Sequence, residues 1–166
     1  MTGIEEFNSL DADGARESLM ACCAVRSWAE GVAAARPYAD PDALVSRAMT
    51  VFDELPGTDI RQAVAAHPAI GARVAGRDRE SVWSRGEQRG AESADAGTAA
   101  AQAEANAAYE RRFGHVFLIR ATGRSAAELL AEARRRLHNT PDDEAIEVRR
   151  ELRDIVALRL RKLVNP

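Results

Sequence analysis

Alanine makes up about a fifth of this 166-residue chain, and helix caps, prolines and glycines divide the chain into short segments. Alanine has the highest helix propensity of all residues, whereas the β-branched residues that favour strands are few. The sequence therefore predicts an all-α protein. Its length suits one domain with a substantial core. We expect residues 1–166 to form a single compact, bundle-like domain of about eight helices.

Caps and prolines give approximate bounds for these helices. The predicted helices start near Asp11, Ser27, Asp40, Thr58 or Asp59, Ser81, Gly97, Ser125 and Thr140. A loop is expected over residues 69–76, and residues 113–119 are the one stretch that reads as extended, too short for a sheet. Residues 92–108 hold few side chains large enough to pack, so either a solvated helix or a partly mobile segment is expected there.

Charge and apolar patterning exclude several classes of protein. With 23 Lys+Arg against 26 Asp+Glu, the net charge of -3 argues against binding of nucleic acid through phosphate neutralisation. No apolar run approaches the roughly 20 residues of a membrane span, and the N-terminus lacks the pattern of a signal peptide. Cys22 and Cys23 are adjacent, which disfavours a relaxed disulfide. We therefore expect both to be small apolar core residues of a reduced, cytoplasmic protein.

His67 is the first candidate for chemistry, because it ends a short predicted helix just before Pro68. The negative end of the helix dipole favours the protonated ring at this position. His67 is therefore a candidate general acid or base. The alternative is a histidine that only caps the end of the helix.

Ser84, Glu87 and Gln88 are a second candidate group, because their i, i+3, i+4 spacing places them on one helix face. That face offers a hydroxyl, a carboxylate and an amide to a polar ligand. The alternative is an ordinary solvated face. Gly86 favours the ligand, since an interior glycine costs about 1 kcal/mol relative to alanine and close approach of a ligand or another backbone would explain it.

Arg159 lies in the middle of the apolar face of the last predicted helix on a helical wheel. The residues of that face are Ala145, Val148, Leu152, Ile155, Val156, Leu160 and Leu163. Arg150, Arg153 and Arg161 fall on the opposite, solvent-facing side. An arginine among core positions is either half of a buried ion pair or an anion-binding group, and its planar fork suits a carboxylate.

Motifs for metals, nucleotides and activated nucleophiles are missing from the sequence. His67, His115 and His138 lack the spacing of a metal site, and HExxH, CxxC, the P-loop, GxGxxG and Gly-x-Ser-x-Gly are absent. The sequence therefore gives little support for a metal site. Hydrolysis by a metal-activated water or a nucleophile is disfavoured for the same reason.

The motifs of this chain, in their order and spacing, resemble the family of 2-oxo-4-hydroxy-4-carboxy-5-ureidoimidazoline (OHCU) decarboxylases. His67-Pro68-Ala69-Ile70-Gly71 matches the family's His-Pro-x-hydrophobic-Gly signature, and Ser84-x-x-Glu87-Gln88 matches its Ser-x-x-Glu-Gln element. Further matches are Phe7-Asn8, Leu10, Cys22-Cys23, Trp28, Arg36-Pro37-Tyr38, Tyr109, Phe113-Gly114, Phe117-Leu118-Ile119, Arg136-Leu137-His138-Asn139, Glu144 and Arg159-Leu160. The chain departs from the family at His115-Val116, which replaces an aromatic-proline pair, and over residues 92–108, which carry little family signal.

The resemblance implies an all-helical carboxy-lyase, often a homodimer, that converts OHCU to (S)-allantoin in urate degradation without a cofactor. It implies catalytic roles for His67 and Glu87, and substrate contacts for Pro68, Ser84, Gln88, Arg159 and the backbone near Ile119. Which of His67 and Glu87 delivers the proton stays open, with His67 favoured. The competing hypotheses are a non-enzymatic helical binding module on the same scaffold and a hydrolase of ureide metabolism.

Overall fold

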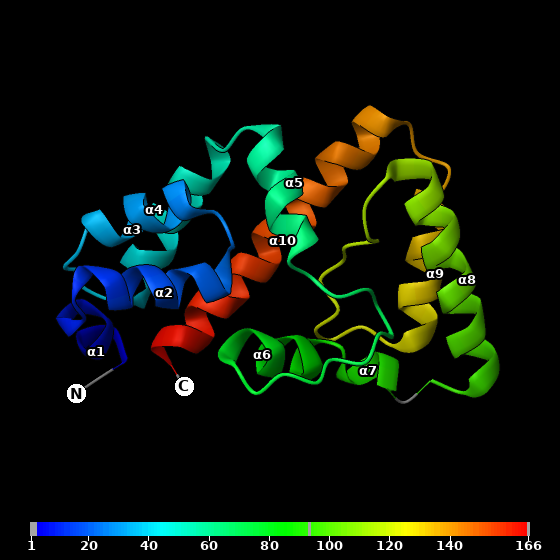
Figure 1. Ribbon diagram of the computed structural model, residues 1–166, viewed down its shortest axis with the longest axis horizontal. Coiled ribbons are helices and arrows are strands. Elements are labelled where there is room, and N and C mark those ends of the chain that lie inside the picture. Colours follow the sequence, from blue (N-terminus) through cyan, green and yellow to red (C-terminus); the bar gives the residue numbers. More distant parts are fainter. Residues whose placement is uncertain (1–2, 93, 166) are drawn as a thin grey trace. The chain divides into compact units, whose positions relative to one another are not determined.

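Ten α-helices and no strand make up the regular structure of residues 3–92 and 94–165, the part of the chain that the computed structural model describes (Figure 1). The helices are α1 (Gly3–Ser9), α2 (Ala12–Cys22), α3 (Arg26–Ala34), α4 (Pro41–Asp53), α5 (Gly57–Ala65), α6 (Arg79–Glu87), α7 (Arg89–Glu92), α8 (Ala96–Phe113), α9 (Ala126–Arg136) and α10 (Pro141–Val164). The predicted all-α class is confirmed. The chain forms two compact units, residues 1–63 with 153–166 (unit 1) and residues 64–152 (unit 2).

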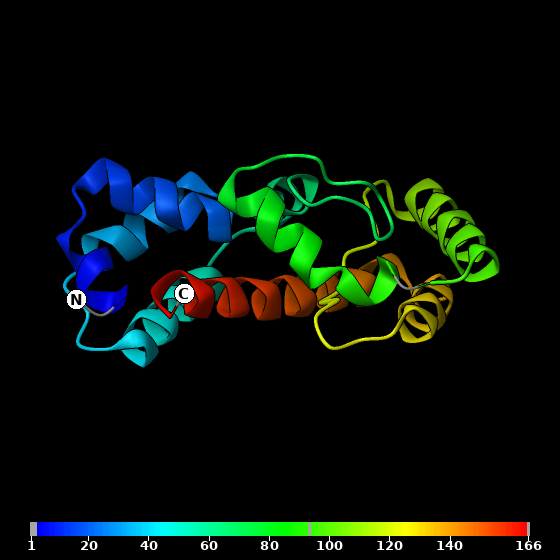
Figure 2. The same cartoon turned by 90° about the horizontal axis from the view of Figure 1, so that it is seen from below.

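Unit 1 contains α1 to α4, most of α5 and the C-terminal part of α10. Helix α3 packs against both α2 and α4, which precede and follow it in the chain (Figure 2). Trp28 is fully buried in this unit, and its indole N–H donates a hydrogen bond to the carbonyl of Ala48 at 2.9 Å. Burial of such a large apolar side chain, with its one polar group satisfied, stabilises the unit.

Unit 2 is built on the pair of helices α8 and α9, which lie side by side (Figure 1). The residues of its core are Ile70, Ala105, Tyr109, Phe117, Ile119, Ala121, Leu129, Leu130 and Ala133. Two of these positions, Phe117 and Ile119, belong to the segment that reads as extended in the sequence. Its first residue, Phe113, is the last residue of α8, which Gly114 ends with a positive φ of 80°, and residues 115–119 are irregular.

Most helix starts follow the sequence signals. The side chains of Asp11, Asp40 and Ser125 each accept a hydrogen bond from the backbone N–H three residues later. The prediction of Ser81 as a cap is wrong, because Asp78 caps α6 and accepts hydrogen bonds from both the N–H and the hydroxyl of Ser81. The order of the caps explains the error: two capping residues stand three positions apart, and the first of them starts the helix.

Other differences are small. Helix α1 was not expected, and α8 begins after Asp95 rather than after the predicted break at Gly97. Apart from Ser93, which lies outside the described residues, the alanine-rich stretch is largely helical and buries Gln102, Ala105 and Asn106. Among the described residues, no helix is both long and apolar enough to cross a membrane.

Candidate active site

The segment from His67 to Gly71 lies in a turn and loop after α5, which ends at Ala65. The backbone N–H of His67 donates to the carbonyl of Val64 at 3.0 Å, so the histidine continues the last turn of the helix, and His67 is half-buried. Ile70 anchors the segment in the core of unit 2, and its carbonyl accepts a hydrogen bond from the Asn106 amide at 2.8 Å. The residues after His67 therefore have a fixed path.

The Gln88 side chain ties this segment to the end of α6. Its Oε1 accepts a hydrogen bond from the N–H of Gly71 at 2.9 Å, and its Nε2 donates to the carbonyl of Ala69 at 3.3 Å. Gln88 is the C-cap of α6, and its backbone N–H still bonds to the carbonyl of Ser84. The structure thus joins the His67 segment to the helix that carries Glu87.

Ser84 is 2% exposed and Glu87 is half-buried, so these residues do not form an ordinary solvated face. The neighbouring Arg85 also binds the protein, since it donates hydrogen bonds to the carbonyls of Val74 and Gly76. A Cβ on Gly86 would meet no atom within 4 Å, so no neighbouring backbone explains that glycine. Close approach of a ligand to Gly86 stays a prediction.

Ile119 lies between two residues whose backbone groups are held by side chains. The carbonyl of Leu118 accepts a hydrogen bond from Nη1 of Arg136 at 2.7 Å, and the N–H of Arg120 donates to Oε2 of Glu151 at 2.9 Å. Ile119 itself is buried, and its own backbone N–H has no acceptor in the part of the chain that the structure describes. This N–H is therefore available as a donor.

A buried network behind Ile119 has no counterpart in the roles predicted from the sequence. Arg136 and Glu144 are almost completely buried and form an ion pair, with Nη2 of Arg136 2.5 Å from Oε1 of Glu144. Tyr109 also donates its hydroxyl proton to Oε1 of Glu144, and Asn139 donates to Oε2 at 3.0 Å. Burial and this hydrogen bond raise the pKa of Tyr109, so the phenol stays protonated.

The sequence held one signal for this network. The apolar positions of α9 that precede Arg136 include Leu129 and Ala133, and all three are buried in the structure. Arg136 and Glu144 both belong to the motifs that resemble the family. Periodicity along α9, however, does not show that Glu144 of α10 supplies the negative charge that pairs with Arg136.

Arg159 belongs to unit 1, whereas the other six candidate site residues belong to unit 2. It is 1% exposed, on the face of α10 that buries Ile155, Val156 and Leu160, and its Nη1 donates to the carbonyl of Ala21 at 3.2 Å. The central position predicted for Arg159 is therefore confirmed. At the edges of the predicted face, Ala145 is exposed and Leu163 only half-buried, whereas Glu144 and Val164 are buried.

The two cysteines are buried and are not joined in a disulfide, as expected from their adjacent positions. Burial raises the pKa of the Cys23 thiol to about 12, so this group is not a thiolate near neutral pH. Among the described residues, no group of three or more His, Cys, Asp or Glu side chains could hold a metal ion.

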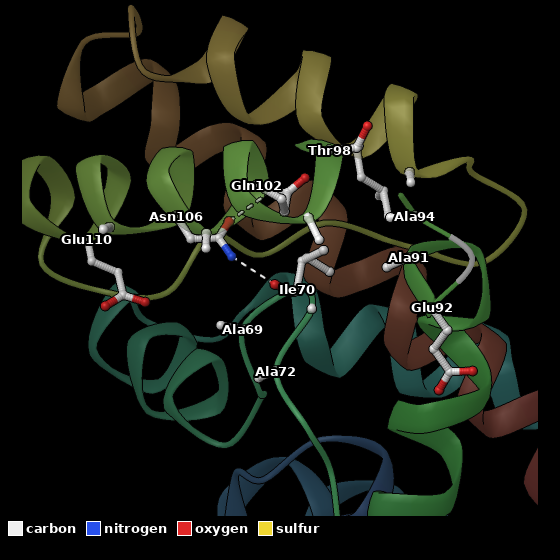
Figure 3. A pocket seen from close by; sticks show the side chains of 16 residues that line it. Ala69, Ile70, Ala72, Ala91, Glu92, Ala94, Thr98, Gln102, Asn106 and Glu110 are labelled. Carbon is white, nitrogen blue, oxygen red and sulfur yellow. Dashed lines mark hydrogen bonds between the residues drawn. The ribbon is translucent and has the colours of Figure 1, made fainter. Parts of the chain in front are cut away.

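A cavity of about 540 Å³ lies within unit 2 beside residues 69–72 (Figure 3). Half of its lining residues are alanines, from α8 and from the segments around it, together with Ile70 and Leu129, and Asn106 reaches across to the Ile70 carbonyl. The carboxylates that line it are Glu92 and Glu110. None of the seven candidate residues lines this cavity, but Ala69 and Gly71, which the Gln88 side chain binds, do line it.

The fold and these residues define a class: an all-α protein with a histidine and a glutamate on two segments that an amide side chain joins. The sequence matches the OHCU decarboxylase family over residues 8–161, and the chain belongs to that family. It is 33% identical over 139 residues to 2-oxo-4-hydroxy-4-carboxy-5-ureidoimidazoline decarboxylase of Amia calva, covering 82% of this chain and 79% of that protein. It is 30% identical over 148 residues to the uric acid degradation bifunctional protein TTL of Arabidopsis thaliana, covering 87% of this chain and 45% of that protein.

Solved structures with a similar fold include the following two. A crystal structure of OHCU decarboxylase in the presence of (S)-allantoin has a TM-score of 0.77 and 26% identity, covering 89% of this chain and 97% of that chain. A structure of (S)-allantoin synthase has a TM-score of 0.72 and 14% identity, covering 97% of this chain and 54% of that chain, and this likeness concerns the fold alone.

Proposed function

We propose that this protein is a carboxy-lyase that decarboxylates OHCU to (S)-allantoin in urate degradation, without a cofactor. Membership of the OHCU decarboxylase family supports the proposal. The observation that carries it is the Gln88 amide, which joins the segment after His67-Pro68 to the end of the helix that bears Glu87. This contact gives the two motifs of the family one common framework.

The chemistry needs no external electron sink. When the bond to the carboxylate breaks and CO2 leaves, the electron pair of that bond stays on the ring carbon. The neighbouring ring carbonyl delocalises the pair as an enolate, a role that cofactors fill in many other decarboxylases. A proton then adds to the carbon from one face, which sets the S configuration. The protein therefore has to anchor the substrate, stabilise the oxyanion and deliver one proton.

The candidate residues supply these functions. We infer that His67 delivers the proton and that Glu87 hydrogen-bonds the substrate hydroxyl or carboxylate. The N–H of Ile119, which has no acceptor among the described residues, suits the developing oxyanion. The residues that we expect to bind or shape the rest of the substrate are Pro68, Ser84, Gln88 and Arg159.

Three further proposals concern the whole protein. The match to the family runs through both units, which supports one functional domain over residues 1–166. The adjacent, buried cysteines Cys22 and Cys23, which do not form a disulfide, agree with a reduced, cytoplasmic setting. The family resemblance implies a homodimer, and sedimentation equilibrium of the purified protein tests that proposal.

The test of the proposed function is to add the protein to freshly generated OHCU and follow the loss of substrate absorbance and the circular dichroism of the product. His67→Ala and Glu87→Ala should each lower kcat by roughly 10²- to 10⁴-fold. Matched controls at exposed positions, His138→Ala and Glu110→Ala, should keep the activity of the parent protein. Racemic allantoin formed at the uncatalysed rate would refute the proposal, and binding without turnover would favour the helical binding module.

A further inference from the structure

The buried network of Arg136, Glu144 and Tyr109 ends on a single backbone group, the carbonyl of Leu118. We propose that Arg136 and Glu144 are positioning residues, which aim the backbone N–H of Ile119 at the oxyanion of the substrate. The inference rests on the proposed function, because it assigns a role to residues that support that site.

The link from Arg136 to Ile119 is the planarity of one peptide group. The carbonyl of Leu118 and the N–H of Ile119 belong to the same peptide unit, and in a trans peptide they point in opposite directions. A hydrogen bond of 2.7 Å from Arg136 to that carbonyl therefore also fixes the direction of the N–H. The guanidinium lies 4.7 Å from the ring centre of Phe117 as well, so it contacts two successive residues of the segment.

Arg136 is itself held in one position. Its Nε and Nη2 both donate to Oε1 of Glu144, and the hydroxyl of Tyr109 donates to the same oxygen. Asn139 donates to the other oxygen of Glu144 at 3.0 Å. Burial opposes the charged form of Arg136, but the hydrogen bond to Glu144 raises the pKa of Arg136 above its usual value, so the guanidinium stays charged. A charged guanidinium with each of its three nitrogens hydrogen-bonded has little freedom to turn.

The other neighbour of Ile119 is fixed by a second side chain. Glu151 of α10 accepts the N–H of Arg120 at 2.9 Å, and its other oxygen lies 3.6 Å from Nη2 of Arg124. Ile119 thus has fixed peptide groups on both sides and a side chain buried in the core of unit 2. A donor that needs no reorganisation when charge develops is what oxyanion stabilisation requires.

Stability alone is a weak explanation for this network. Buried ion pairs are often no more stabilising than apolar residues of similar volume, since both charges lose their hydration. The network instead directs Nη1 of Arg136 at a loop carbonyl beside the candidate site. A positioning role predicts that kcat falls in a variant that is still folded, whereas a purely structural role predicts lower stability with normal kcat.

The test compares Arg136→Lys and Tyr109→Phe with the control Arg135→Lys. Arg135 is the preceding residue of α9 and pairs with Glu132 and Glu147 at the surface, without contact to Leu118. At a temperature well below unfolding, Arg136→Lys should lower kcat for OHCU by about 100-fold with a smaller change in KM. Tyr109→Phe should give a smaller loss in kcat, and Arg135→Lys should give none.

An NMR measurement keeps this test independent of the proposed function. The amide resonance of Ile119 should shift in Arg136→Lys and in Tyr109→Phe but not in Arg135→Lys, and (S)-allantoin should move it most in the parent protein. If Arg136→Lys does not fold, kcat and the Ile119 resonance of Tyr109→Phe test the positioning role instead. Unchanged kcat together with an unchanged Ile119 resonance in a folded variant would overturn the proposal. A parent protein that leaves OHCU untouched would refute the function instead, and the resonance of the free variants would still decide the positioning role.

Discussion

Arg159 carries a full charge within an apolar helix face, and lysine keeps that charge without the planar fork. If Arg159 binds an anionic oxygen of the substrate, Arg159→Lys should lower kcat/KM by about 100-fold, because a single ammonium does not reproduce two parallel N–H donors. Steady-state kinetics with OHCU measures this effect, and circular dichroism checks that the variant keeps its helices.

Two other arginines of α10 provide matched controls. Arg150 and Arg161 are exposed, and Arg161 pairs with Asp42 at 2.9 Å on the surface. Exposed ion pairs contribute little, so Arg150→Lys and Arg161→Lys should change stability by no more than about 0.5 kcal/mol and leave kcat/KM unchanged. Equal kinetic effects of all three substitutions would show that Arg159 has no special role.

Single residues differ in how far the sequence reveals them. Arg159 could be predicted because one helical wheel shows it among apolar neighbours, and burial confirms that position. The pairing of Arg136 with Glu144 could not, because these residues lie on different helices and each is polar. The hydrogen bond from Arg136 to the carbonyl of Leu118 could not be predicted either, because side-chain periodicity does not report on backbone acceptors.

At the scale of the helix, the caps make a measurable contribution. The Asp40 side chain accepts the N–H of Ala43 at 2.8 Å, and Pro41 follows it at the start of α4. Asp40→Ala should lower the free energy of unfolding by about 1 kcal/mol, since it leaves an N–H at the helix start without its partner. Urea denaturation measures this change.

Asp40→Asn is the control for that prediction, because asparagine caps helices about as well as aspartate. It should unfold within a few tenths of a kcal/mol of the parent protein. If both variants lose the same stability, the negative charge rather than the hydrogen bond would be the stabilising feature, and the capping explanation would be wrong.

The success of the caps also explains where helix prediction failed. A cap signal shows that a helix starts nearby, but it does not choose between two capping residues three positions apart, such as Asp78 and Ser81. Helix α1 has only seven residues and was overlooked, although Thr2 and Glu5 have the sequence spacing of a capping box. Short helices depend on tertiary packing, which for α1 includes the burial of Phe7.

At the scale of the whole molecule, helix periodicity predicts a buried face but not the helices that cover it. Helix α10 shows this clearly, because Val148 and Leu152 belong to unit 2 whereas Ile155 and Leu160 belong to unit 1. The wheel described one continuous apolar stripe over these residues. Two compact units were therefore not predicted, although the all-α class was.

The stability of the whole molecule should depend on pH through Glu147. Hydrogen bonds from Arg135 lower the pKa of Glu147 from 4.5 to about 2. A carboxylate with a lower pKa in the folded state stabilises the protein above pH 4.5, and this contribution is lost as the pH falls towards 2. Because Arg135 is half exposed, we expect solvent screening to limit the contribution to roughly 1 kcal/mol.

Glu147→Gln isolates that contribution. Urea unfolding at pH 6 should show the variant to be less stable than the parent by this amount, and the difference should shrink as the pH falls below 4.5, since the parent's carboxylate then becomes protonated more easily in the unfolded chain. Glu104→Gln, at an exposed position of α8, should follow the parent at every pH. A difference between Glu147→Gln and the parent that stays constant down to pH 2 would show that the ion pair does not act through the ionisation of Glu147.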